Sequence, residues 1–305
     1  MKKLTPIFLL LLTSCDLLVD VKVPYDGDKV VMNAIQSADS LWTVELTRSR
    51  YILAPYNRPG APFFPIDFAQ VTITGPDGTT DHLQLEKSGS GRFIGTARPE
   101  RGKTYKISVI ANGLDPVEAE MKMPPIVHIV NIEWDSSNMQ SPTGPNDYSA
   151  VHIPFKVTFN DPPDEKNFYA VEVFQTMVHH YTDPRTNTTY YDTTFQELGV
   201  HIEDPGIASR NDGRQWFADD IFEGKSYVAP MRIDYFRSGR DETIELQVRL
   251  TSMSEEYFRY LETIELNAEV DGDPFAQPVQ VYSNTTNGFG IFAGATYDRR
   301  VYKAN

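Results

Sequence analysis

The sequence predicts a mostly β protein, with an N-terminal immunoglobulin-like β-sandwich followed by a second β-rich domain that contains one amphipathic helix. Aromatic residues make up 12% of the chain, and Tyr and Phe favour pleated, half-buried surfaces. The 21 prolines and 19 glycines supply turns between short segments. Within these segments apolar and polar residues alternate with a period of two, which is typical of strands with one buried face.

Residues 29–125 are expected to form the first sandwich. The Gly-Pro-Asp-Gly sequence at 75–78 is a strong turn signal between two strands, and the prolines at 124–125 mark the end of the module. Short strands separated by turns at this spacing suggest an immunoglobulin-like arrangement. Its strands are expected at residues 29–35, 42–48, 70–74, 82–85, 92–95 and 104–110.

The loop at residues 51–65, YILAPYNRPGAPFFP, interrupts this module. Proline prevents it from continuing a strand ladder. A stiff aromatic loop loses little entropy when it binds, so we predict a contact surface for a partner. The alternative is that the loop folds its own phenylalanines over the edge of the sandwich. The candidate contact residues are Tyr51, Tyr56, Phe63 and Phe64.

Residues 126–305 are expected to form the second domain, with strands at 151–159, 168–174, 190–195 and 243–250. A helix is predicted near 253–266. Ser252 is its predicted cap, and Glu255 would complete a capping box. The apolar positions recur at helical spacing and should pack on the sheet of this domain. They are Met253, Tyr257, Tyr260, Leu261 and Ile264.

The last part of the chain carries glycines that alternate with Phe289 and Phe292. This pattern indicates a backbone packed closely against another element, because glycine has no side chain to prevent the approach. The sequence contains no visible internal repeat.

Residues 1–14 are predicted to be an export signal. Lys2 and Lys3 precede a short apolar run at 7–12, which is too short to span a bilayer as a helix. The sequence at 12–15, Leu-Thr-Ser-Cys, resembles the bacterial lipobox, and this resemblance implies that Cys15 is lipidated. The alternative is an incidental cysteine after an ordinary signal. Residues 15–28 would form a lipidated tether that holds the protein on a membrane.

Charge and cysteine content exclude several classes of function. The net charge is −14, from 28 basic and 42 acidic residues, which argues against nucleic acid or another polyanion as partner. Because Cys15 is the only cysteine, the chain has no intramolecular disulfide, zinc–thiolate site or cysteine nucleophile. We predict no cofactor.

Characteristic short segments are spread along the chain, at 23–24, 44–46, 71–73, 161–163, 167–169, 222–227, 254–260, 278–284 and 287–292. In this order they resemble a Bacteroidota lipoprotein family, domain of unknown function 4249. The resemblance implies an envelope lipoprotein of the outer membrane that assists a TonB-dependent receptor, and it implies no catalytic residue. Asp16 is followed by two leucines rather than by further acids, so the face of the outer membrane is left undecided.

Candidate chemical sites are few. The pair His179 and His180 suggests a metal site, but adjacent strand residues point to opposite faces. His201 and Glu203 would share one face of a strand, although surface polar residues are the better interpretation. No metal site is predicted. Short acidic segments at 211–213 and 271–273 are similar to parts of calcium loops, and plain turns are favoured. Asp-Ser-Leu at 39–41 and Asp-Thr-Thr at 192–194 resemble a periplasmic O-glycosylation pattern, which makes Ser40 and Thr193 candidate sites.

Three functional hypotheses follow. The first is a non-enzymatic accessory or binding partner of a TonB-dependent outer-membrane transport system. The second is a lipid-anchored hydrolase or glycan-processing enzyme, which would need a concave pocket with converging carboxylates or histidines. The third is a purely structural envelope protein.

Overall fold

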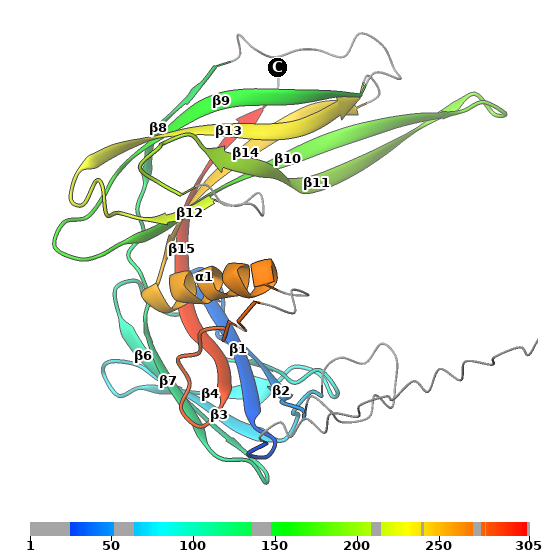
Figure 1. Ribbon diagram of the computed structural model, residues 1–305. Helices are drawn as coiled ribbons and strands as arrows, with labels where there is room; N and C mark the ends of the chain where they lie inside the picture. The colour runs from blue at the N-terminus through cyan, green and yellow to red at the C-terminus, as the bar shows by residue number, and fades with distance from the viewer. Residues whose placement is uncertain are drawn as a thin grey trace, which may run out of the picture.

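A computed structural model describes residues 25–51, 64–135, 148–208, 215–238, 241–270, 276–277 and 279–303. Of these described residues, 56% lie in strands and 7% in helix, which confirms the predicted mostly β class. Fourteen of the fifteen described strands lie on one hydrogen-bonded path that folds into two stacked sandwiches, and one short strand pairs beside this path (Figure 1). The single helix of these ranges is not long and apolar enough to cross a membrane.

The first sandwich contains seven strands in the order β7-β6-β3-β4-β5-β2-β1. The sheet turns over at β4, which pairs first with β3 and then with β5. This is the strand order of an immunoglobulin-like sandwich. The strands are β1 (Val30–Ser37), β2 (Thr43–Arg48), β3 (Ala69–Thr74), β4 (Thr80–Leu85), β5 (Arg92–Ile94), β6 (Thr104–Ala111) and β7 (Val117–Lys122).

A tyrosine near the start of β6 supports this assignment. The Tyr105 hydroxyl accepts a hydrogen bond of 2.7 Å from the backbone N–H of Glu100, five residues upstream. Such a bond is the tyrosine corner of immunoglobulin-like domains. The Tyr105 ring packs edge-on against the buried Trp42 at 4.8 Å, so the corner also anchors the core. The predicted immunoglobulin-like sandwich is therefore confirmed.

The second sandwich repeats the same strand order. Its strands follow one another as β15-β14-β10-β11-β13-β9-β8, which matches β7 to β1 of the first sandwich position by position. The additional strand β12 (Gln215–Ala218) pairs with β10. The others are β8 (Ile129–Trp134), β9 (Tyr148–Asn160), β10 (Phe168–Asp183), β11 (Thr188–Ile202), β13 (Ser226–Ser238), β14 (Asp241–Met253) and β15 (Phe289–Lys303).

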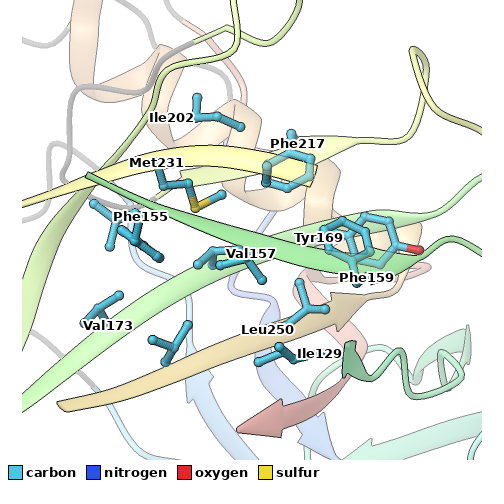
Figure 2. Packing of buried hydrophobic residues seen from close by; sticks show 14 of the residues in the cluster. Ile129, Phe155, Val157, Phe159, Tyr169, Val173, Ile202, Phe217, Met231 and Leu250 are labelled. Carbon is cyan, nitrogen blue, oxygen red and sulfur yellow. The ribbon is translucent and has the colours of Figure 1, made fainter. Parts of the chain in front are cut away.

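Apolar side chains from both layers fill the second core. Figure 2 shows Phe155, Val157 and Phe159 of β9 facing Tyr169 and Leu250 of the opposite layer. These residues alternate with exposed or partly exposed neighbours along β9, as period-two patterning requires. A fold repeat therefore exists although the sequence shows none.

Strand β15 belongs to both sandwiches. Its first half pairs in parallel with β1, from Phe289 to Ala295, and its second half pairs antiparallel with β14. Figure 1 shows β15 running from one sandwich into the other. Phe292 is buried in the core of the first sandwich. The region expected as 126–305 thus supplies a strand to the region expected as 29–125.

A glycine makes this parallel pairing close. Gly290 has φ of +104°, and a Cβ at this position would lie 1.9 Å from the carbonyl oxygen of Met32. The predicted close packing of the C-terminal glycines is confirmed. The side chain of Asn284 adds bonds to the backbone of Phe292 and of Glu120, so the same segment also holds β7.

The helix α1 (Glu255–Val270) lies beside the junction (Figure 1). Its cap is Ser254, whose hydroxyl accepts from the N–H of Tyr257. The predicted cap at Ser252 is wrong, because Ser252 is the penultimate residue of β14 and pairs with Tyr169. Phe258 of the helix stacks on Phe168 at 4.6 Å, and Tyr257 and Leu261 of the predicted face pack beside it, so the predicted packing on the second sheet is confirmed. The predicted helix start at 253 is wrong, because Met253 is the last residue of β14.

Candidate functional site

The β10–β11 hairpin is the most prominent surface feature of the second sandwich. The strands are 16 and 15 residues long and pair from Val173 opposite Leu198 to Asp183 opposite Thr188. Asn187 closes the turn with φ of +53° and donates its N–H to the carbonyl of Asp183. Figure 1 shows the hairpin reaching away from the body of the sandwich.

The distal half of this hairpin exposes large aromatic side chains. Tyr191 is 68% exposed and Phe195 is 60% exposed. Because Val171 and Val173 point into the core, strand alternation places even-numbered residues of β10 on the outer face. Phe174 and His180 of β10 lie on this outer face together with aromatic neighbours on β11, and we call this set the aromatic row. It consists of Phe174, His180, Tyr191 and Phe195.

Ring contacts order the aromatic row. Phe174 and Phe195 stack with centroids 5.3 Å apart, and His180 lies edge-on to Tyr191 at 5.0 Å. Offset and edge-to-face aromatic pairs of this kind contribute about 0.5–1.5 kcal/mol beyond their buried area. The row is therefore a pre-ordered surface, which loses little side-chain entropy when a partner covers it.

An ion pair continues the row towards the first sandwich. Arg249 donates to both carboxylate oxygens of Glu172, at 2.5 and 2.8 Å, and its guanidinium lies 4.6 Å from the Phe174 ring centre. Burial acts to lower the pKa of Arg249, but the hydrogen bonds and charge of Glu172 outweigh it, so the pKa is raised. Arg249 stays charged, and the pair rigidifies the base of the hairpin. A cavity of about 200 Å³ adjoins this pair, between β1, α1 and β15.

The two adjacent histidines do not converge. His179 contacts the hydroxyl of Thr194 at 2.9 Å on the inner face, whereas His180 meets Tyr191 on the outer face. Opposite orientation was predicted from strand geometry and is confirmed. Across the described ranges no group of three or more His, Cys, Asp or Glu side chains has the geometry to hold a metal ion.

His201 takes part in a cluster that the sequence does not reveal. His152, His201 and Arg232 surround Asp234, at 2.7, 3.1 and 2.9 Å. Burial acts to raise the pKa of Asp234, but the hydrogen bond from His152 and the charges of Arg232 and His201 lower it below its usual value. Glu203 joins only at 3.9 Å from Arg232. Three strands bring this cluster together, so no local signal predicts it.

A cavity of about 370 Å³ lies between α1 and the segment after β12. Its lining includes carboxylates, but two of them are held in ion pairs. Asp220 contacts Lys166 at 2.9 Å, and Glu255 contacts Arg259 at 2.7 Å. Asp220 and Glu255 are therefore structural charges, and they do not form a general acid and a general base directed at a ligand.

A buried network joins three segments that carry the family resemblance. Tyr169 donates its hydroxyl to Asp161 at 2.5 Å, and the N–H of Gly224 donates to the second oxygen of Asp161 at 2.7 Å. Burial raises the pKa of Asp161, and the two hydrogen bonds only partly offset this. Nearby, Asp219 accepts from the N–H of Asn167. The network fixes the turn before β10, and with it the start of the hairpin.

The predicted contact loop is only partly described. Tyr51 packs on Tyr25 at 5.0 Å, and Arg50 lies over the ring of Phe64 at 5.7 Å. Tyr56 and Phe63 lie outside the described residues, as do Cys15 and the segments 211–213 and 271–273. Contact of this loop with a partner stays a prediction.

The two candidate glycosylation sites are exposed. Ser40 lies in the turn after β1, where Arg101 pairs with Asp39 at 2.9 Å. Thr193 lies in the middle of β11, on the outer face of the hairpin. Both hydroxyls are accessible, and their modification stays a prediction.

Comparison with known proteins gives one family and a distant structural likeness. The family model of Domain of unknown function (DUF4249) matches residues 18–300. The chain is similar to a DUF4785 family protein from Legionella pneumophila, with 14% identity and a TM-score of 0.22 over 72% of this chain and 50% of that one. It is also similar to a two-domain fibronectin type III segment of chicken tenascin, with 12% identity and a TM-score of 0.20 over 92% and 100%. This chain therefore spans about half of the Legionella protein. No curated protein matches.

Proposed function

This chain belongs to the DUF4249 family, and we propose that it is a lipid-anchored envelope lipoprotein that binds a protein partner through the aromatic row of the β10–β11 hairpin. The observation that carries the proposal is the row itself, in which Tyr191 and Phe195 remain largely exposed on an ordered hairpin. Aromatic residues are enriched at protein interfaces and dominate their energetics.

The position of the anchor supports this function. Cys15 precedes Tyr25, the first described residue, by ten residues, so the connection spans at most about 36 Å. Tyr25 lies beside the first sandwich, where its ring meets that of Tyr51. Lipidation of Cys15 would hold the first sandwich near the membrane. The hairpin belongs to the second sandwich, which the anchor does not hold directly. The two sandwiches would then act as a spacer that presents the row.

A TonB-dependent receptor of the outer membrane is the partner that the family resemblance favours. The protein would assist uptake without catalysing a reaction, and it could serve either face of the outer membrane. Affinity purification from native membranes tests this partner. The full lipoprotein should recover a receptor, and the Tyr191→Ala/Phe195→Ala double variant should lose it.

A matched control is available in the first sandwich. Phe68 is 82% exposed and lies outside the hairpin, so Phe68→Ala removes an exposed ring without touching the row. Receptor recovery that falls equally with Phe68→Ala would contradict binding through the hairpin. Feeding labelled palmitate tests the anchor, because Cys15→Ala should abolish the label.

Hydrolysis of a glycan is the second candidate function, and the cavity of about 370 Å³ beside α1 is the place for it. Glu262 is a third lining carboxylate, and it is the one to test because its substitution leaves the Asp220–Lys166 and Glu255–Arg259 ion pairs intact. Release of reducing sugar from envelope glycans that is lost with Glu262→Gln would support an enzyme. Activity unchanged in this variant would exclude the cavity as the active site.

A further inference from the structure

The outer edge of β11 is open. From Thr188 to Leu198 this strand pairs with β10 on one side, and β13 takes up its other side only from Gly199 onward. No described strand pairs with the edge between those residues. The register with β10 is continuous over the same stretch, so the edge is regular and free of bulges. Alternate N–H and C=O groups of β11 therefore point away from the hairpin.

This edge has few of the devices that protect exposed strands. Residues 188–198, TTYYDTTFQEL, contain no Lys, Pro or Gly, and their charges are Asp192 and Glu197. The other outer strands differ. The backbone of Glu118 on β7 is bonded by Thr286, and β8 has a register shift after Ile129. An unprotected edge of this length is a template for another strand.

We propose that a second copy of this chain pairs with this edge, β11 against β11 in antiparallel register, with Thr193 opposite Thr193 on the twofold axis. The open stretch from 188 to 198 is itself centred on Thr193. In this register Tyr191 lies opposite Phe195 of the second copy, twice, and all four rings share the outer face. Cross-strand aromatic pairs of this kind stabilise antiparallel sheets.

Other registers are less favourable. A twofold axis perpendicular to the sheet places the outer faces of both copies on the same side. Residues opposite each other must then both belong to the outer face or both to the inner face, so the axis has to pass through a residue of β11. Centring on Asp192 would place two carboxylates directly opposite each other, which is destabilising. Centring on Thr194 would set Tyr191 opposite Glu197 and shorten the overlap. Of these three registers, the one centred on Thr193 pairs the aromatic rings and keeps the carboxylates of Asp192 apart.

Cysteine cross-linking in cells that produce the full lipoprotein tests this register. Opposite residues of an antiparallel pair have Cα atoms about 4.5–5.5 Å apart, which suits a disulfide. Thr193→Cys should give a disulfide-linked dimer under a mild oxidant such as copper phenanthroline. Thr189→Cys is the matched control, because two such residues would lie about 27 Å apart. The wild-type chain, whose single cysteine is Cys15, reports any background.

Each outcome decides the proposal. A dimer with Thr193→Cys and none with Thr189→Cys supports it. Equal cross-linking of both variants, no cross-linking of either, or an adduct of Thr193→Cys with a protein of another mass overturns self-pairing. A glycan on Thr193 of the wild-type chain, detected by intact mass, also overturns it, since the two threonines meet on the axis.

A second measurement does not depend on introduced thiols. Thr193→Lys places two like charges at the axis and should weaken dimerisation about tenfold in sedimentation experiments on the detergent-solubilised lipoprotein. Thr80→Lys, an equivalent change at the exposed start of β4, should leave it unchanged. A wild-type chain that sediments as a monomer, or a Thr193→Lys variant that dimerises like wild type, would contradict the proposal.

Discussion

The two sandwiches share one strand order but present different surfaces. The hairpin that occupies the same place in both is short in the first, where β3 and β4 have six residues each, and long in the second, where β10 and β11 have 16 and 15. The short hairpin ends within its sandwich, whereas the long one continues past the core and carries the aromatic row. One topology thus gives a compact domain and a domain with a projecting surface.

The charges of the two regions differ as well. Residues 29–125 contain 11 basic and 10 acidic side chains, a net charge of +1, whereas residues 126–305 contain 14 and 28, a net charge of −14. The acidity of the protein is therefore concentrated in the second sandwich. The aromatic row lies in this acidic region, which favours partners with a neutral or basic contact surface.

The largest expected effect comes from the strand that the two sandwiches share. Gly290→Val would drive a side chain into the Met32 backbone at positive φ, and it should lower the free energy of unfolding by about 4 kcal/mol or more. Chemical denaturation measures this. Gly113 also has a positive φ, of +74°, but open space surrounds it, so Gly113→Ala tests the backbone strain alone. This variant should lower the free energy of unfolding by only about 1 kcal/mol. Similar losses in both variants would mean that β15 does not couple the sandwiches.

The ion pair at the base of the hairpin should have the next largest effect. Arg249→Ala leaves Glu172 without its bidentate partner and should cost about 3 kcal/mol of stability. Glu172→Gln/Arg249→Ala, measured in a double-mutant cycle, should recover part of this loss, because no unpaired charge then remains. Additive losses would show that the pair does not stabilise the second sandwich as a unit.

The buried Asp161 should have a smaller, pH-dependent effect. Asp161→Asn replaces an acceptor for the Gly224 N–H with a donor and should cost about 2 kcal/mol at neutral pH. Because the folded-state pKa of Asp161 is raised above 3.8, the folded protein binds the extra proton, and the wild type gains stability as the pH falls through the folded pKa. The difference between wild type and variant should therefore widen on acidification. Denaturation midpoints at several pH values check the sign.

The smallest effect on stability should come from the aromatic row. Tyr191→Ala and Phe195→Ala remove largely exposed rings and should each change the free energy of unfolding by no more than about 0.5–1 kcal/mol. Loss of partner recovery with near wild-type melting would separate binding from folding. A large drop in melting temperature would instead assign the row a structural role.

Local patterning was sufficient for the elements with one buried face. β2, β3 and β6 alternate buried Val44, Val71 and Ile107 with exposed or partly exposed neighbours, and the sequence predicts each of them. The long hairpin was predicted only in part, as strands at 168–174 and 190–195. Its distal residues have solvent on both faces, so they show no period of two. The β-favouring Thr and Tyr residues on either side of the Asp-Pro-Arg-Thr-Asn turn at 183–187 were the available signal.

The sequence by itself determined the β class, the helix that follows β14, the single cysteine and the close approach of the glycines around Phe289 and Phe292, because each depends on nearby residues or on composition. Only the tertiary structure decided that β1 pairs with β15, that both regions repeat one strand order, and that Asp234 gathers two histidines and an arginine. These features join residues that lie far apart in the chain. A strand carries the pattern of its buried face, but the identity of its neighbour depends on how the whole sheet packs and closes.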